Sequence, residues 1–267
     1  MRLSQALLEA GVSLSSITAS TASKIVLWGI ETKRDSKSLY STLLQAPDTY
    51  LVAPMEDLNF NKFIKYEAGT EEGVLALFSK ALHELVGSEK PHIFEALDEG
   101  YISAECNVGE EEAESFVKWS KGKESVWVFG AEWETHPKAK LLAAWLAFIS
   151  KTIPVNFIIV GVEAQMAASK VSPIPETNIE LEGFDGTVMY ACLALKEDEE
   201  KAIFASPQFA IAAKAKDGDK VRIQTAWGEY LRRLDVDKNM KGTIALLPFA
   251  NLPSGYRYAK SRITLVG

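Results

Sequence analysis

The sequence holds few of the residue types that build redox centres or metal sites. Among its 267 residues there are only two cysteines and three histidines. Cys106 and Cys192 lie far apart, and neither belongs to a Cys-x-x-Cys pair. The chain therefore predicts no disulfide framework and fits a reducing compartment. Because an iron–sulfur cluster normally takes four ligands, two cysteines cannot hold one alone.

Long apolar runs and an excess of basic charge are also missing. The longest apolar run, roughly Leu141 to Ile149, is about half of a membrane span. The first sixteen residues contain Glu9 and lack the continuous apolar core of a signal peptide. The formal charge of −7 disfavours binding to phosphate backbones, so we expect no nucleic-acid partner. We expect a cytoplasmic protein that reaches a membrane only through a partner.

Signatures of nucleotide and acyl-transfer chemistry are absent as well. There is no GxxxxGK[ST] loop and no GxSxG elbow. Gly29 and Gly130 are single glycines at predicted strand ends, without the GxGxxG turn that lets a backbone approach a pyrophosphate. The sequence therefore predicts no catalytic, cofactor-binding or metal-ligating residue and no cofactor, although dispersed sites escape a motif search.

The histidines and one cysteine were weighed as the remaining candidates. His83, His92 and His136 have no Cys, His or Asp at metal-ligand spacing, so a solvated or hydrogen-bonded imidazole is the better interpretation. Cys106 precedes a predicted helix start, a setting that can lower the pKa of a thiol. The glutamates that follow oppose thiolate formation, which favours a half-buried structural cysteine.

A run of glutamates follows Cys106. Paired carboxylates can serve acid–base chemistry, but a first helical turn explains acidic residues without any chemistry, because they complement the helix dipole. We therefore interpret the run as a solvated helix start; it comprises Glu110, Glu111, Glu112 and Glu114.

The first half of the chain alternates short apolar runs with helical patterns, which is typical of a parallel sheet covered by helices. The predicted helices are 36–46, 69–87, a segment that begins at Gly109, and 138–150; the predicted strands are 24–30, 49–54, 126–133 and 156–162. Thr70 and Gly87 are the expected caps of the second helix. The tryptophans at 28, 127, 133 and 145 are expected to pack in the core.

The composition changes near Ser172, where a polar, proline-bearing stretch of the kind that joins domains begins. Beyond it, short strands separated by turn residues at intervals of about ten residues predict a small β-barrel. Asp217-Gly218-Asp219 is a tight-turn sequence, and Gly228 allows a chain reversal. We expect an α/β domain over 1–172 and a β-barrel domain over 173–267.

Several segments resemble the molybdopterin-oxidoreductase superfamily, and most specifically the large iron–sulfur subunit of bacterial NADH-quinone oxidoreductase (respiratory complex I). The barrel segment is DGDKVRIQTAWGEYLRRLDVDKNMKGTIALLP; the α/β segments are EAGTEEGVLALFSKAL, ALDEGYISAECNVGEEEAE and VWVFGAEWETHPKAKLLAAWLAF. The resemblance covers roughly Lys24 to Gly267. It implies a double-psi-like barrel of the kind that binds the molybdopterin dinucleotide. The family's cysteine-rich cluster domains, its glycine-rich cofactor loop and its metal ligands have no counterpart here.

Two functional hypotheses follow. The leading one is a non-catalytic accessory subunit of an NADH-quinone-oxidoreductase-type respiratory complex, whose partners are the other subunits and whose contact with the inner face of the cell membrane is indirect. The alternative is a ligand-binding protein or small enzyme that holds a nucleotide or pterin between its two domains. An unrelated α/β enzyme remains a third interpretation.

Overall fold

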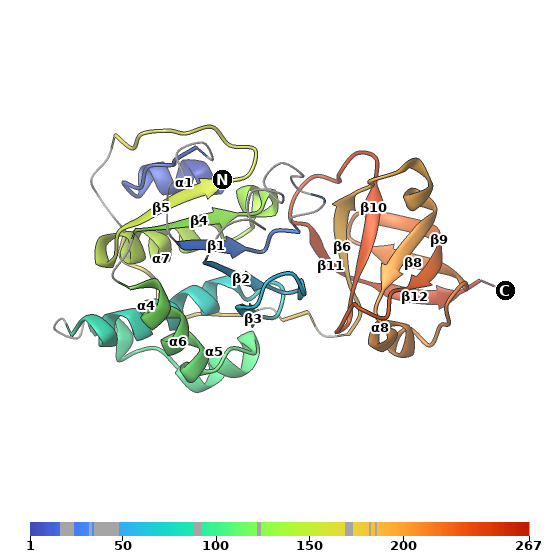
Figure 1. Cartoon of the computed structure of the whole chain (residues 1–267), viewed down its shortest axis with the longest axis horizontal. Coiled ribbons are helices and arrows are strands. Elements are labelled where there is room, and N and C mark those ends of the chain that lie inside the picture. The colour runs from blue at the N-terminus through green and yellow to red at the C-terminus, as the bar shows by residue number, and fades with distance from the viewer. Residues whose placement is uncertain are drawn as a thin grey trace. The chain divides into compact units, whose positions relative to one another are not determined.

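The computed structural model describes residues 1–16, 24–31, 34, 48–87, 92–121, 124–168, 173–181, 183, 184 and 186–266. The chain divides into two compact units, which are described here one by one (Figure 1). Unit 1 comprises Met1–Ile30 and Ser38–Gly183, and unit 2 comprises Glu31–Lys37 and Phe184–Gly267. The division expected at residue 172 therefore falls after Gly183 in the structure. The helix predicted over 36–46 lies outside the described residues.

Unit 1 contains a five-stranded parallel sheet in the order β3-β2-β1-β4-β5. Its strands are β1 (Lys24–Trp28), β2 (Thr49–Ala53), β3 (Phe63–Lys65), β4 (Ser125–Phe129) and β5 (Val155–Ile159). The central strands β1 and β4 are buried along nearly their whole length, because both faces of the sheet are covered. Four of the five strands were predicted from the sequence, although the strand expected over 126–133 ends at Phe129.

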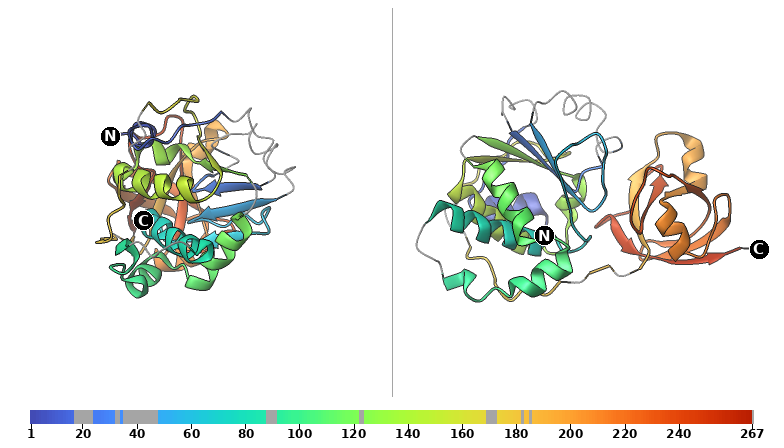
Figure 2. Two further views of the ribbon diagram at one scale, coloured as in Figure 1. Left: turned by 90° about the vertical axis from the view of Figure 1, so that its left-hand side faces the viewer. Right: turned by 60° about the horizontal axis from the view of Figure 1, so that its bottom comes forward.

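The described helices of unit 1 form one layer. Helix α7 packs against α1 and α4, and α4 also contacts α5 and α6 (Figure 2). Their bounds are α1 (Leu3–Glu9), α4 (Glu71–Val86), α5 (Glu99–Cys106), α6 (Glu110–Ser120) and α7 (Ala139–Thr152), with short 3-10 turns η2 (His92–Phe94) and η3 (Ala131–Thr135).

Helix α4 confirms the strongest helix prediction, with one correction. Gly87 ends it in the left-handed conformation, with φ +71°, as a C-terminal glycine does. Thr70 occupies the N-cap position, but its side chain makes no capping bond there. Its hydroxyl instead donates to the Glu67 carbonyl at 2.6 Å, which fixes the turn before the helix.

The core between the sheet and these helices is aromatic. Trp28 lies at its centre and is fully buried. Its ring centroid lies 5.4–6.4 Å from those of Tyr66, Phe78, Trp127, Phe129 and Trp133, distances typical of packed aromatic pairs. The four tryptophans that the sequence assigns to the core are all buried.

Unit 2 is a seven-stranded, nearly closed barrel with the order β11-β6-β10-β7-β9-β8-β12 (Figure 2, right). Pairs β6·β10 and β7·β9 are parallel, and the other pairs are antiparallel. The strands are β6 (Val188–Leu193), β7 (Ala202–Ala205), β8 (Lys220–Thr225), β9 (Gly228–Val236), β10 (Ile244–Phe249), β11 (Tyr258–Lys260) and β12 (Arg262–Leu265); α8 (Pro207–Ala212) and the 3-10 turn η4 (Glu197–Lys201) complete the unit.

The barrel closes through its last two strands. Only Ser261 separates β11 from β12, yet β11 pairs with β6 and β12 pairs with β8. The two ends of the row of strands are therefore joined by one continuous stretch of chain.

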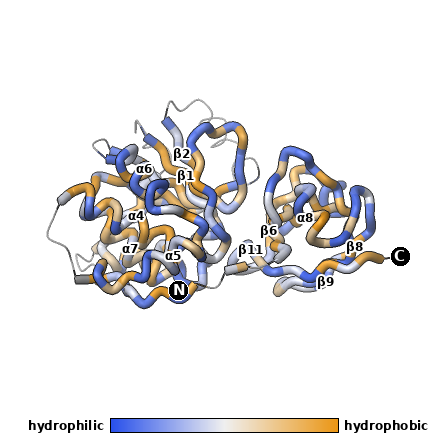
Figure 3. The backbone as a smooth tube through the Cα atoms, turned by 90° about the horizontal axis from the view of Figure 1, so that it is seen from below, coloured by the Kyte–Doolittle hydropathy of each residue, from blue (hydrophilic) through white to orange (hydrophobic). Residues whose placement is uncertain are grey.

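Hydrogen bonds accepted by two aspartate side chains stabilise the β8–β9 hairpin. Asp217 accepts the Val236 amide at 2.8 Å, and Asp219 accepts the Lys216 amide at 2.7 Å. Strands β8 and β9 then pair up to Gly228, where the sequence predicts the reversal. In Figure 3 the hydropathy of unit 2 alternates over short lengths, as expected where successive residues face the core and the outside.

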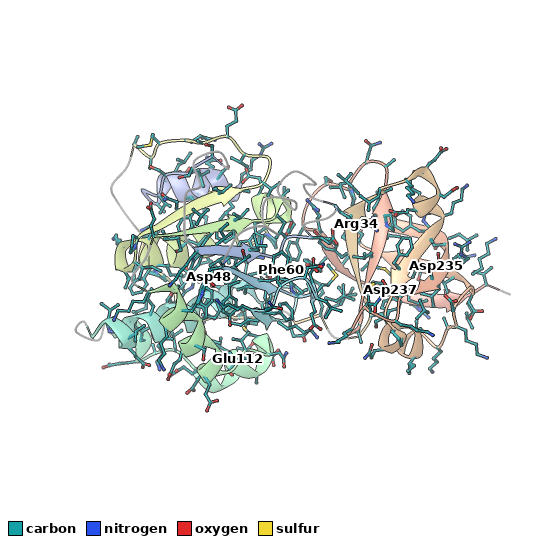
Figure 4. The ribbon with its side chains drawn as sticks, in the orientation of Figure 1. Arg34, Asp48, Phe60, Glu112, Asp235 and Asp237 are labelled. Carbon is teal, nitrogen blue, oxygen red and sulfur yellow. The ribbon has the colours of Figure 1, made fainter. Side chains whose placement is uncertain are left out.

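One residue from the first half of the chain is held in unit 2. The Arg34 guanidinium donates to the Leu193 carbonyl at 2.8 Å and to the Glu199 carboxylate at 2.7 Å (Figure 4). It also lies over the Phe204 ring, 5.7 Å from the centroid. No local sequence pattern indicates this attachment, because its partners are more than 150 residues away.

Within the described residues, no helix combines the length and the apolar character needed to cross a membrane. The general fold prediction, a parallel α/β region followed by a barrel-like sheet, is confirmed by these observations.

Candidate functional site

The carboxyl edge of the parallel sheet is where an open α/β fold places a ligand. From β1 the chain adds β2 and β3 on one side, and later adds β4 and β5 on the other side. The order of strands therefore reverses between β1 and β4, which is the usual position of a ligand crevice. Gly29 follows β1 directly, and Gly130 follows β4 directly. These two single glycines thus lie at the reversal point.

The space beside these glycines is filled by side chains of the same chain. Glu132 is only 1% exposed. A Cβ atom at Gly29 would lie 2.7 Å from Glu132 Oε1 and 2.7 Å from Trp133 Nε1, and a Cβ at Gly130 would overlap the Glu132 carboxylate. In a dinucleotide-binding fold, glycine lets a phosphate approach the backbone. Here glycine makes room for Glu132 and Trp133.

A buried Glu–His pair lies at the same edge. Glu71, in the first turn of α4, and His136, at the end of η3, are joined at 3.2 Å, and their side chains are 1% and 2% exposed. The Lys138 amide donates to His136 Nδ1 at 3.0 Å. Because Nδ1 accepts this bond, the ring proton lies on Nε2, from where it is donated to Glu71.

A second carboxylate beside this pair meets a lysine. Glu72 lies 3.1 Å from the Lys138 ammonium, which also donates to the Glu180 carbonyl. Burial raises the pKa of the Glu72 carboxyl above its ordinary value, and the nearby Lys138 opposes this shift without reversing it. The N-terminus of α4, an ordinary place for an anionic ligand, is therefore next to the chain's own carboxylates.

The chemistry available to this cluster is limited by its burial. A general acid or base must come within hydrogen-bond reach of its substrate. Glu71, His136 and Glu132 are each at most 3% exposed as residues, so a substrate outside the folded unit does not reach them. The hydrogen bonds of the cluster join the start of α4 to the residues that follow η3.

Cys106 lies behind the same helix and is equally inaccessible. It ends α5, is fully buried, and its thiol donates to the Thr70 carbonyl at 3.5 Å. Burial raises the pKa of this thiol to about 12, and Glu71 and Glu105 add to the shift. The setting is the structural cysteine that the sequence favours, but it is fully buried where the sequence predicts partial burial. The reactive-thiol interpretation is wrong for this environment, because the thiol remains protonated at neutral pH.

The glutamate run begins α6, as its position in the sequence predicts. Glu112 accepts the Gly109 amide at 2.9 Å and closes the first turn. Glu114 pairs with Lys118 one turn later, at 2.6 Å. Glu110 and Glu111 are exposed. These contacts are those of a helix start.

Of the two expected states, solvated or hydrogen-bonded, His136 shows the second, because it bonds to Glu71 and Lys138. His83 is buried on α4, with its ring stacked on Phe94 at a centroid distance of 5.1 Å. His136 is the buried partner of Glu71, and His92 begins η2. Among the described residues, no three His, Cys, Asp or Glu side chains are gathered as a metal ion would require.

The surface hollows of unit 1 lie elsewhere. One of about 490 Å³ lies between α5 and residues 177–180, where Asp98, Tyr101 and Glu180 line it. Another of about 220 Å³ lies between α4 and α5 and is lined by Lys80, Glu84 and Glu99 among others. Both hollows are rich in carboxylates, so neither is suited to a phosphate group.

Sequence reasoning missed the cluster of Glu132, Glu71 and His136. One signal was available: a single glycine stands at the end of each of two predicted strands, and a glutamate stands two residues after the second glycine. The pairing of Glu71 with His136 had no such signal, since 65 residues separate them.

Comparison with known proteins adds no assignment: no family model matches the chain, and none of the curated proteins is detectably similar to it in sequence.

Proposed function

We propose that the chain is a non-catalytic accessory subunit of an NADH-quinone-oxidoreductase-type respiratory complex, and a degenerate relative of the molybdopterin oxidoreductases. The observation that supports it best is the filled carboxyl edge of the sheet, where Glu132 and Trp133 take the space beside Gly29 and Gly130. A fold that keeps the ligand-binding topology but fills the ligand position suits a subunit whose role is to dock and shield others.

The buried Glu71–His136 pair supports the same proposal. In a working site these groups would face a cavity and change partners during the reaction. Here they bind one another and Lys138 across two elements, which stabilises the unit. A role in structure accounts for these bonds.

We further propose that unit 2 is the double-psi type of barrel found in molybdopterin dinucleotide-binding domains. Its two parallel pairs, β6·β10 and β7·β9, are joined by the antiparallel pair β10·β7. Parallel neighbours inside a small barrel require long crossing connections, and simple up-and-down barrels have none. The resemblance of residues 217–248 to that domain points in the same direction.

The test is purification of the lightly tagged chain from its native host, with its bound proteins and organic cofactors identified by mass spectrometry in one preparation. We expect the subunits of the respiratory complex in fixed proportion, and a peripheral position on the inner face of the cell membrane through that complex. Recovery of a free monomer, together with intact assembly of the complex in a deletion strain, contradicts the proposal.

The same preparation tests the alternative of a ligand-binding protein. Gentle denaturation would then release a pterin, flavin or nucleotide in a 1:1 ratio to the chain, with no partner protein. That result would overturn the accessory-subunit proposal.

A further inference from the structure

The two units carry opposite charge. Unit 1 has 13 Lys and Arg against 24 Asp and Glu residues, a formal charge of −11. Unit 2 has 16 Lys and Arg against 12 Asp and Glu residues, a formal charge of +4. The net charge of −7 is therefore the sum of a strongly acidic unit 1 and a basic unit 2. A local excess of one sign on a protein of the other sign indicates a surface that meets an oppositely charged partner.

Part of this charge lies on one side of the barrel, on strands β9, β8 and β12. Alternate residues Val221, Ile223 and Leu234 point into the core and are fully buried. The residues between them point outward, since successive side chains of a strand face opposite sides. We call this the outer face; it comprises Lys220, Arg222, Gln224, Glu229, Leu231, Arg233, Arg262 and Thr264, all exposed.

The register arranges the outer face in rows across the three strands. Lys220 lies opposite Arg233, and Arg222 lies opposite Leu231 on one side and Thr264 on the other. Gln224 lies opposite Arg262 in the next row. Directly opposed residues have Cβ atoms about 4.5–5.5 Å apart. The cations are thus neighbours on one surface.

Some of these cations are held in place and others are free to bind. Arg222 pairs with Glu229 at 2.6 Å and Arg233 with Asp235 at 2.5 Å, so both guanidinium groups are oriented (Figure 4 labels Asp235). Lys220 and Arg262 form no ion pair within the part of the chain that the structure describes. Leu231, beside Arg222, is 44% exposed. Arginine is enriched at protein interfaces, and the exposed leucine adds apolar area between the cations.

We propose that the outer face docks an acidic protein surface of a neighbouring subunit, an inference that rests on the proposed function. Charge complementarity selects the partner: unpaired Lys220 and Arg262 take its carboxylates, and Leu231 takes an apolar side chain between them. A protein fits better than a nucleic acid, because Leu231 offers an apolar contact and no aromatic side chain of the outer face offers a base-stacking platform.

The test compares two charge-reversed variants in the native host. Lys220→Glu with Arg262→Glu changes the outer face, and Lys140→Glu with Lys151→Glu makes the same change in net charge on exposed positions of α7 in unit 1. Retention with the respiratory complex is measured at increasing salt, after unfolding curves show that both variants fold. We expect retention of the outer-face variant to fall by about tenfold or more, with the α7 variant at the wild-type level.

A photo-crosslinking residue in place of Leu231 identifies what lies against the outer face. We expect a crosslink to a segment rich in Asp and Glu on another subunit. Equal retention of both variants would overturn the docking inference and leave the proposed function intact. Failure of the wild-type chain itself to associate with the complex would overturn the proposed function instead.

Two further outcomes would identify a different binding partner for the outer face. Concentration-dependent self-association of the wild-type chain in sedimentation velocity, lost in the outer-face variant, would show that the occupant is a second copy. Binding of a fluorescent single-stranded or duplex oligonucleotide at physiological salt, lost in the same variant, would show that it is a nucleic acid. Either result overturns the proposal of an acidic protein surface.

Discussion

The two units are stabilised in different ways. Unit 1 is acidic and has a core of large aromatic side chains around Trp28, together with buried charged groups at the carboxyl edge of its sheet. Unit 2 is basic and has a smaller core of mostly aliphatic side chains, with its long-range ion pair at Arg34 and Glu199. Unit 1 is closed where its topology would bind a ligand, whereas unit 2 carries its distinctive charge on the outside. The two units therefore differ in where their charged groups lie: inside in unit 1 and on the surface in unit 2.

Each unit contains one buried thiol, whose labelling can report the unfolding of that unit. Cys106 belongs to unit 1 and Cys192 to unit 2, and both are fully buried. A buried thiol reacts with an alkylating reagent only when its surroundings open. Pulse labelling across a denaturant series, read by mass spectrometry, therefore reports the unfolding of each unit separately.

The largest effect is expected from Trp28→Ala. Removal of a fully buried tryptophan from an aromatic cluster leaves a large cavity and costs about 3–5 kcal/mol of unfolding free energy. Cys106 should become labelled at a much lower denaturant concentration, while Cys192 stays at its wild-type midpoint. Chemical denaturation followed by pulse labelling measures both.

The matched control is Trp227→Ala in unit 2, at a partly buried position that packs against the barrel core. It should move the Cys192 midpoint by less and leave Cys106 unchanged. If either substitution shifts the labelling midpoints of both thiols, the two units unfold as one. The difference between their cores then does not lead to separate stabilities.

A smaller loss is expected from His136→Ala. The substitution leaves the Glu71 carboxylate buried without the imidazole that it contacts at 3.2 Å, and loss of a hydrogen bond to a charged group costs about 2–3 kcal/mol. The Cys106 midpoint should fall accordingly. The double variant with Glu71→Gln should be more stable than His136→Ala alone, because a neutral amide costs less to bury without the imidazole donor than a carboxylate does.

Equal stabilities of the single and double variants would contradict this account of the pair. Assembly with partner subunits should persist in the double variant, because its residues are buried and only position the edge of the sheet.

In unit 2, Arg34→Ala is expected to cost about 2 kcal/mol. The change removes two hydrogen bonds, one of them to a carboxylate, and leaves Glu199 without its guanidinium partner. The Cys192 midpoint should fall while Cys106 holds. Arg34→Lys should restore only part of the loss, because an ammonium group cannot reproduce the planar guanidinium geometry. A shift of Cys106 instead would show that the 31–37 segment stabilises unit 1.

Local sequence patterns predicted the longer elements, whereas the short elements α1, α5, α8 and β3 were not predicted. The residues of β1 are apolar on both faces and can only be a covered strand, and α4 carries its acidic first turn and its terminal glycine in the sequence. The turn at Asp217 and the reversal at Gly228 follow from backbone preferences over a few residues. Such features depend on residues that lie close together in the sequence, so local patterns can predict them.

The buried charged groups could not be predicted in the same way. Glu132 looks like an ordinary solvated residue until β1 and β4 are placed side by side, since Gly29 stands about a hundred residues earlier. His83 was expected to be solvated or hydrogen-bonded, yet it stacks on Phe94. Arg34 and Glu199 are 165 residues apart. Their partners are set by tertiary packing.

The smallest effect, and the only gain, is expected from Glu72→Gln in unit 1. Burial raises the pKa of Glu72 in the folded state, so the folded chain keeps this proton at pH values where the unfolded chain, with a carboxyl pKa near 4.5, has lost it. The contribution of this group to stability is present below the unfolded pKa and is lost as the pH rises through the folded pKa. The amide does not titrate, so the variant should gain stability relative to wild type as the pH rises to neutral.

Glu114→Gln on α6 supplies a control with the opposite sign. Lys118 lowers the pKa of the exposed Glu114 carboxyl, so its stabilising contribution is present at neutral pH and is lost as the pH falls through the folded pKa. Thermal unfolding from pH 4 to pH 8 should therefore show Glu72→Gln moving above wild type as the pH rises, and Glu114→Gln moving slightly below it. Loss of stability in Glu72→Gln at neutral pH would mean that the Lys138 contact outweighs the cost of burial. The Glu72–Lys138 contact of unit 1 would then be a stabilising ion pair, as the Arg34–Glu199 contact of unit 2 is. The two units would then not differ in the sign of this contribution to stability.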